Sequence, residues 1–229
     1  RKRRQTKDML LQDPPKSWDR QMRRLGFRAR HLRRVAATPR FDRASAWGEF
    51  RWAVLLATYY CLMRPGEPGR GSGKLPFDTK RGITLSHVIW WPPSVTGTGR
   101  WAVCLMIVPI KDSTGRAQRM PCEIAARHDG AEPSDDPLCG YSAILRHWRR
   151  RSRAVCKRAT PCSGEPFCAD CCGAALFAGP DGAVWTSPAG RESVREMCVV
   201  IGEDPSEYGG HSLRIAGATD LVEILGPDV

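Results

Sequence analysis

The chain has 229 residues, of which 41% are hydrophobic, so it is long enough to form one core of ordinary size. Its 36 Lys and Arg residues outnumber its 24 Asp and Glu residues, which gives a formal net charge of +12. A membrane span is not supported, because no stretch approaches ~18 uninterrupted apolar residues. No secretory signal is recognised either. We therefore expect a soluble intracellular protein, nuclear in a eukaryote and cytoplasmic otherwise.

The positive charge is concentrated in two segments. Residues 1–40 hold 14 Lys and Arg against three Asp, and a second basic cluster lies in a stretch without acidic residues between positions 142 and 164. Such clusters attract nucleic acid, because neutralising phosphates releases condensed counterions. A solvated basic face or a localisation signal is the alternative. The residues predicted to contact DNA are Arg1, Lys2, Arg3, Arg4, Arg149, Arg150 and Arg151.

The first 43 residues are interpreted as a basic arm or linker, a remnant of an N-terminal DNA-binding region, with one short helix near 21–35. The strongest helical pattern follows at 44–63, and we expect it to end or kink at Pro65. Its second half is apolar on nearly all sides, which predicts a central, buried helix. The face expected to point inward is formed by Trp47, Phe50, Val54, Ala57 and Cys61.

The rest of the chain, 44–229, is expected to form one domain. Three strand-like segments precede several helices, and two of those strands are separated by a polar turn at 111–116 that suits a hairpin. The order indicates an α+β fold, mostly helical, with a small antiparallel sheet. The expected strands are 83–91, 101–110 and 118–124, with short extended pieces at 174–177 and 183–185; the expected helices are 137–155, 193–201 and 211–225.

A few polar residues stand out against this pattern. Arg64 follows the most apolar helix and needs an anionic partner, for which Glu67 is the structural alternative. Lys111 lies at the mouth of the hairpin turn, where it either reaches a neighbouring groove or is solvated. His211 and Arg214 are three residues apart at a helix start, so their side chains share a face. These residue types suit a phosphate group.

Three segments carry a resemblance to a known family. Residues 57–67 (ATYYCLMRPGE), 110–116 (IKDSTGR) and 210–219 (GHSLRIAGAT) resemble the conserved boxes of the tyrosine recombinase, or phage integrase, catalytic domain. The resemblance covers roughly residues 44–229, and it implies that they form an incomplete catalytic domain. The Arg-Pro-Gly-Glu and His-Ser-Leu-Arg sequences are most similar to the corresponding motifs in recombinases of DIRS-type retrotransposons.

The resemblance implies site-specific DNA recombination and integration, as in mobile elements. In that family a tyrosine attacks a DNA phosphodiester and forms a 3′-phosphotyrosyl link, with no metal or other cofactor. Arg64 and Arg214 would hold the non-bridging oxygens, because guanidinium groups match phosphate geometry. Lys111 would protonate the leaving 5′-oxygen, His211 would handle the proton of the attacking hydroxyl, and Glu67 would orient one of these groups. The implied partner is double-stranded DNA, bound by the full-length protein as a tetramer and by this chain as a monomer.

Some features depart from the family pattern. The nucleophilic tyrosine of the family follows the His-x-x-Arg helix, whereas Tyr59, Tyr60, Tyr141 and Tyr208 all precede His211. We therefore expect a fragment that lacks its nucleophile and does not cleave DNA alone. Pro68 and Gly69 follow Glu67 where the family continues a helix, which weakens the role assigned to Glu67.

Eight of the ten cysteines fall into two groups. Cys61, Cys104 and Cys198 lie in apolar runs, as buried free thiols of a reducing compartment do. The insertion at about 156–173 is Cys-rich, and we interpret it as a surface insertion without metal. A structural zinc site is the alternative, with His147 as a further ligand, and it would make the protein a zinc-stabilised nucleic-acid-binding module. A domesticated recombinase that only binds DNA is another. The zinc ligands would be Cys156, Cys162, Cys168 and Cys171.

Overall fold

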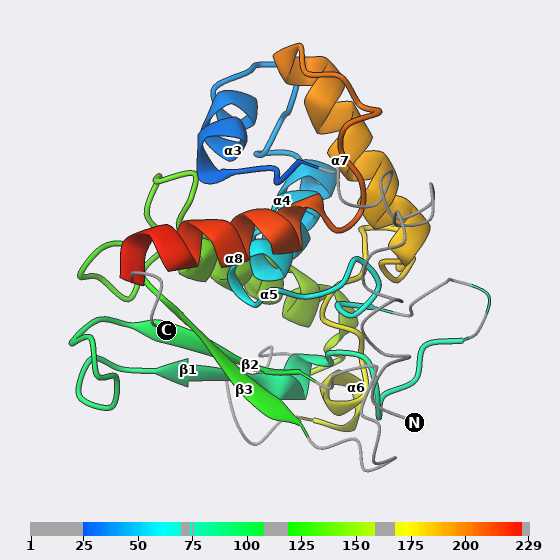
Figure 1. Ribbon diagram of the computed structural model, residues 1–229. Coiled ribbons are helices and arrows are strands. Elements are labelled where there is room, and N and C mark those ends of the chain that lie inside the picture. Colours follow the sequence, from blue (N-terminus) through cyan, green and yellow to red (C-terminus); the bar gives the residue numbers. More distant parts are fainter. Residues whose placement is uncertain (1–24, 70–73, 75, 108–118, 159–167, 226–229) are drawn as a thin grey trace, which may run out of the picture.

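The computed structural model describes residues 25–69, 74, 76–107, 119–158 and 168–225. Within these residues the fold is α+β, as predicted, with most helices on one side of a small antiparallel sheet (Figure 1). No helix among them combines the length and the apolar character that crossing a membrane requires. The elements are α3 (Ala29–Ala36), α4 (Ala46–Tyr60), η1 (Leu85–His87), β1 (Val88–Trp91), β2 (Ala102–Ile107), β3 (Met120–Ala125), α5 (Gly140–Val155), α6 (Ala169–Cys172), α7 (Ser187–Ile201) and α8 (Ser212–Leu225).

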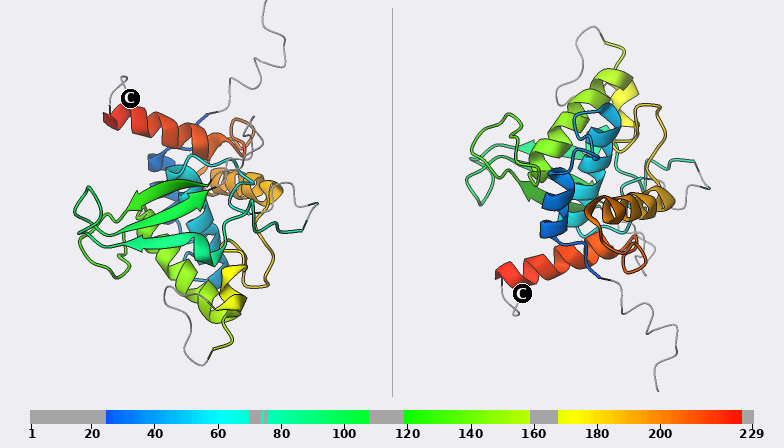
Figure 2. Two further views of the ribbon diagram at one scale, coloured as in Figure 1. Left: turned by 90° about the horizontal axis from the view of Figure 1, so that it is seen from below. Right: turned by 90° about the horizontal axis from the view of Figure 1, so that it is seen from above.

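Helix α4 forms the centre of the molecule, as predicted. It packs against α5 and α8, which lie on opposite sides of it in both views of Figure 2. Its N-terminus is capped by Ser45, whose hydroxyl accepts a hydrogen bond from the Gly48 amide at 3.0 Å. Every residue from Trp52 to Tyr59 is buried. The prediction for Trp47 is wrong: it is 48% exposed, because the first turn of α4 lies at the edge of the core.

The end of α4 is set by a left-handed residue and not by Pro65. The helix stops at Tyr60, and Leu62 has a φ of 50°, which is uncommon for a residue other than glycine. The Met63 amide then donates to the Thr58 carbonyl at 3.0 Å, which closes the last turn. The chain therefore leaves the helix before Arg64, and the predicted end at position 63 was three residues too late.

The three-stranded sheet has the order β1-β2-β3 and is antiparallel throughout. The predicted hairpin strands are confirmed as β2 and β3, with Ile107 opposite Met120 as the pair nearest the connecting segment; that segment, 108–118, lies outside the described residues. The first predicted strand is shortened to β1. Ile83 and Thr84 pair instead with the 174–177 segment, through the Leu176 amide and the Ile83 carbonyl at 2.8 Å.

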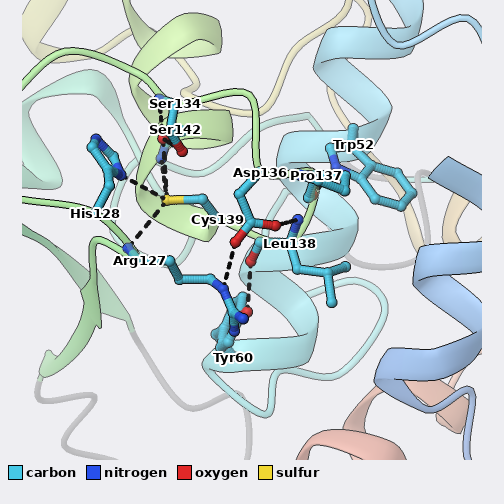
Figure 3. Close-up of polar contacts among 10 residues, drawn as sticks. All are labelled: Trp52, Tyr60, Arg127, His128, Ser134, Asp136, Pro137, Leu138, Cys139 and Ser142. Atoms are coloured by element: carbon cyan, nitrogen blue, oxygen red, sulfur yellow. Dashed lines mark hydrogen bonds and ion pairs between the residues drawn. The ribbon is translucent and has the colours of Figure 1, made fainter. Parts of the chain in front are cut away.

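A polar network fixes the loop between β3 and α5 to the central helix (Figure 3). The Tyr60 hydroxyl donates to the Leu138 carbonyl at 2.6 Å, and the Trp52 indole donates to the Pro137 carbonyl at 2.7 Å. The Cys139 thiol lies 3.7 Å from the His128 Nδ1 and accepts from the Ser142 amide at 3.5 Å. The Cys139 thiol therefore caps the N-terminus of α5. It is not accessible as a nucleophile, because Cys139 is only 1% exposed.

The last two helices differ from their predicted forms at opposite ends. Helix α7 begins at Ser187 and not at 193, because the Thr186 hydroxyl accepts from the Ala189 amide at 3.2 Å and Pro188 occupies the first turn. Helix α8 matches its predicted range within one residue. From their helical spacing, Leu213 and Leu221 are both expected to turn into the core. Leu213 is buried, whereas Leu221 is 45% exposed, because the second half of α8 extends beyond the core.

His147 is buried beside the aromatic rings of Phe50 and Phe177. Its Nε2 lies 2.9 Å from the Leu176 carbonyl, and burial lowers its pKa to about 4 from an ordinary 6.5. Below about pH 6.5 the unfolded chain binds a proton at this histidine, whereas the folded chain does not. The free energy of unfolding therefore decreases as the pH is lowered from 6.5 to 4.

We expect His147→Gln to make that decline shallower by at most about 3 kcal/mol, because the glutamine amide keeps a donor for Leu176 and does not titrate. Urea unfolding of both proteins at several pH values measures the difference. Parallel declines in the two proteins would contradict the expectation. His87 has a pKa that burial likewise lowers to about 4, so its contribution remains in both proteins.

Candidate functional site

Arg64 is held by Glu67 immediately after α4. The Glu67 side chain accepts from the Arg64 backbone amide at 2.6 Å and from its guanidinium at 3.2 Å. Glu67 itself is 6% exposed, whereas one third of the Arg64 side chain is accessible. The buried carboxylate therefore holds the base of the arginine in place and leaves part of its guanidinium free to meet an external anion. The local turn, with the Glu67 amide bonded to the Arg64 carbonyl at 3.0 Å, is short and tight.

The segment after Arg64 is fixed from both sides. The buried Trp185 indole donates to the Pro65 carbonyl at 2.9 Å. At Gly210, a Cβ would lie 2.7 Å from the Pro65 ring, so only glycine allows the chain before α8 to approach this closely. The start of α8 is therefore packed directly against the segment that carries Arg64.

Arg214 comes to the same place through the contact between α8 and α4. A Cβ on Gly217 would lie 2.2 Å from the Tyr59 carbonyl oxygen and 2.8 Å from the Leu62 side chain. This close approach places the first turn of α8, with the half-buried Arg214, beside the end of α4. The small residue at position 217, three residues after Arg214, is thus required by the close packing of α8 on α4.

Arg64, Glu67 and Arg214 line one cavity of about 380 Å³. Its other walls come from the end of α4 and from the end of the β2–β3 hairpin next to the 108–118 segment. Its lining residues are Cys61, Leu62, Met63, Arg64, Glu67, Ile107, Met120, Pro121, Cys122 and Arg214. Residues from three distant parts of the sequence therefore meet around a space large enough for a phosphodiester group.

Two further predicted residues are less closely defined. Lys111 lies outside the described residues, but Ile107 and Met120, on either side of the 108–118 segment, both line the cavity. His211 is exposed and lies directly before α8, where its carbonyl accepts from the Ile215 amide at 2.9 Å. It is three residues from Arg214, but it is not among the residues that line the cavity.

Two cysteines in the cavity wall were not predicted as part of the site. Burial raises the pKa of the Cys61 thiol, and a hydrogen bond from Cys61 lowers the pKa of the Cys122 thiol. Cys61 was expected to be a buried free thiol, and nothing in the β3 sequence marked Cys122. Their meeting depends on how the hairpin lies across the end of α4, which sequence periodicity does not specify.

The predicted basic clusters have different outcomes. Arg1, Lys2, Arg3 and Arg4 lie outside the described residues. Arg149 forms a double hydrogen bond with Glu132 at 2.7 and 2.9 Å, and Arg150 forms one with Glu49 at 2.8 and 2.9 Å. Arg151 donates to the Ala175 carbonyl at 3.2 Å. These three arginines thus have roles in the fold, and their contact with DNA stays a prediction.

Comparisons of the chain with protein-family models, with curated proteins and with solved structures gave no match.

Proposed function

We propose that this chain is the phosphate-binding part of a DNA strand-exchange enzyme of the tyrosine recombinase type. The observation that carries the proposal is the cavity in which Arg64 and Arg214 meet. Arg64 and Arg214 are far apart in the sequence. The packing of α8 on α4 brings both of them to the same cavity. Two guanidinium groups around a cavity favour an anion with several oxygens, which a phosphodiester supplies.

In the proposed reaction, Arg64 and Arg214 stabilise the negative charge that develops on the phosphate in the transition state. Glu67 acts as a positioning residue, because its carboxylate accepts hydrogen bonds from both the backbone amide and the guanidinium of Arg64. Lys111 would protonate the leaving 5′-oxygen from the segment that joins β2 and β3. His211 would accept the proton of the attacking hydroxyl, which requires its side chain to turn toward the cavity when DNA is bound.

The tyrosines within the described residues are poor candidates for the nucleophile. The hydroxyls of Tyr59, Tyr60 and Tyr141 bond to Asp220, the Leu138 carbonyl and the Ala131 carbonyl. Burial raises the pKa of each of these phenols, and that of Tyr208, so none of the four is activated for attack. We propose that the attacking tyrosine is supplied by a segment of the full-length protein other than the described residues.

The proposal is tested with full-length protein and a nicked duplex, from which the strand beyond the nick diffuses away after cleavage and traps the intermediate. A covalent protein–DNA complex, with the 3′-phosphate attached to a tyrosine identified by mass spectrometry, is the expected result. DNA binding without any covalent complex would instead support the alternative of a domesticated recombinase that only binds DNA. It would overturn the enzymatic proposal.

A further inference from the structure

Three cysteines of the insertion gather at one point, away from the residues that line the arginine cavity. The sulfur atoms of Cys156, Cys168 and Cys171 all lie within 4.8 Å of one another. The distance between the sulfurs is 3.7 Å for Cys156 and Cys168, and 3.3 Å for Cys168 and Cys171. Thiolates that share a tetrahedral zinc ion lie about 3.8 Å apart, because each Zn–S bond is about 2.3 Å long. The trio is therefore close to the spacing that zinc imposes.

The three thiols come from different parts of the local fold. Cys156 ends α5, where its amide bonds the Ser152 carbonyl at 2.9 Å. Cys168 precedes α6 and Cys171 lies within it, so the Cys-x-x-Cys turn directs both sulfurs to the same side. Cys168 and Cys171 are buried and Cys156 is partly buried. Such a closed environment is typical of a structural site and not of a catalytic one.

We propose that Cys156, Cys168 and Cys171 bind a structural zinc ion that fastens the insertion to the end of α5. On binding, the three thiols release their protons and three zinc–thiolate bonds form, without any change of oxidation state. A fourth donor completes the tetrahedron. His147 does not belong to the group of described residues whose ligand atoms lie within 4.8 Å of one another. Cys162 was included in the predicted ligand set, and it lies outside the described residues.

The metal would stabilise the contacts between the segment that follows α6 and the residues of η1. After α6 the chain runs directly into contacts with η1: the Leu85 amide donates to the Ala174 carbonyl at 2.9 Å, and the Ser86 hydroxyl donates to the Cys172 carbonyl at 2.9 Å. Fixing Cys168 and Cys171 to α5 therefore also fixes the segment that pairs with residues 83–85. This stabilisation is independent of the proposed recombinase function.

The test is the metal content of the whole chain, purified under reducing conditions without added zinc or chelator. We expect close to one zinc per chain by mass spectrometry of the metal, and intense tetrahedral thiolate absorption bands after exchange for Co²⁺. Cys168→Ser and Cys171→Ser should reduce the zinc content below ~0.2 per chain. The matched control is Cys172→Ser, which changes an exposed neighbour outside the trio and should retain zinc.

Wild-type protein with less than ~0.2 zinc per chain would overturn the proposal without any variant being needed. Loss of zinc in Cys172→Ser equal to that in Cys168→Ser would overturn the assignment of these three ligands. A count of free thiols that is two short, without zinc, would indicate a disulfide and would also overturn it. Failure of the DNA cleavage experiment has no bearing on these readouts, so the two proposals fail separately.

Discussion

Arg214→Ala is expected to lower the rate of covalent complex formation on nicked DNA by about 10²–10³. The reason is that its guanidinium faces the same cavity as Arg64, where it would stabilise charge that appears only in the transition state. Arg64→Ala should have an effect of the same order. Arg214→Lys should recover only part of the loss, because an ammonium keeps the charge but not the paired donors that match two phosphate oxygens.

The matched control for this prediction is Arg195→Ala in α7. Arg195 is largely exposed and its ion pair with Glu192 is long, at 3.8 Å. Its removal takes away the same positive charge, so it lowers general attraction to DNA equally. A rate for Arg195→Ala as low as that for Arg214→Ala would mean that overall charge, and not the cavity, explains the loss.

Gly217→Ala is expected to destabilise the chain by about 1–3 kcal/mol, although Ala normally favours a helix over Gly. The new Cβ would lie 2.2 Å from the Tyr59 carbonyl oxygen, which belongs to the backbone of α4 and cannot turn aside. Helix α8 must therefore move away from α4 and carry Arg214 with it. Urea unfolding measures the loss of stability, and the covalent-complex assay should show a lower rate as well.

Gly97→Ala is the control for this second prediction, because a Cβ at Gly97 would meet nothing within 4 Å. It should change the free energy of unfolding by less than about 0.5 kcal/mol. If Gly217→Ala were equally neutral, then α8 would not depend on the close approach at this position. The account of how Arg214 reaches the cavity would then be wrong.

Much of the fold could be predicted from the sequence, because local patterns determine it. The apolar run of α4, the two strands of the β2–β3 hairpin and helix α5 all matched the structure. Two of the errors occurred where a single residue decides where a helix ends or begins. Leu62 ends α4 by adopting a left-handed conformation, and Thr186 starts α7 by capping it.

The candidate site was predicted in part. The predicted set was Arg64, Glu67, Lys111, His211 and Arg214. The structure brings Arg64, Glu67 and Arg214 to one cavity, whereas His211 does not line it and Lys111 lies outside the described residues. The sequence could not predict Cys122 in the cavity wall, because its place depends on the packing of one element on another. For the cysteine insertion, spacing alone did not predict that the return of the chain to the end of α5 brings Cys156 to Cys168.

The central claim is that Arg64 and Arg214 hold one phosphate between them. It is tested most directly by NMR of the arginine Nε–Hε groups during titration with a short duplex DNA, with assignments from Arg64→Lys and Arg214→Lys. The account predicts that the signals of both arginines shift together, with a single dissociation constant, and that replacing either one weakens the response of the other. Shifts at different DNA concentrations, or no shift at one of the two residues, would contradict it.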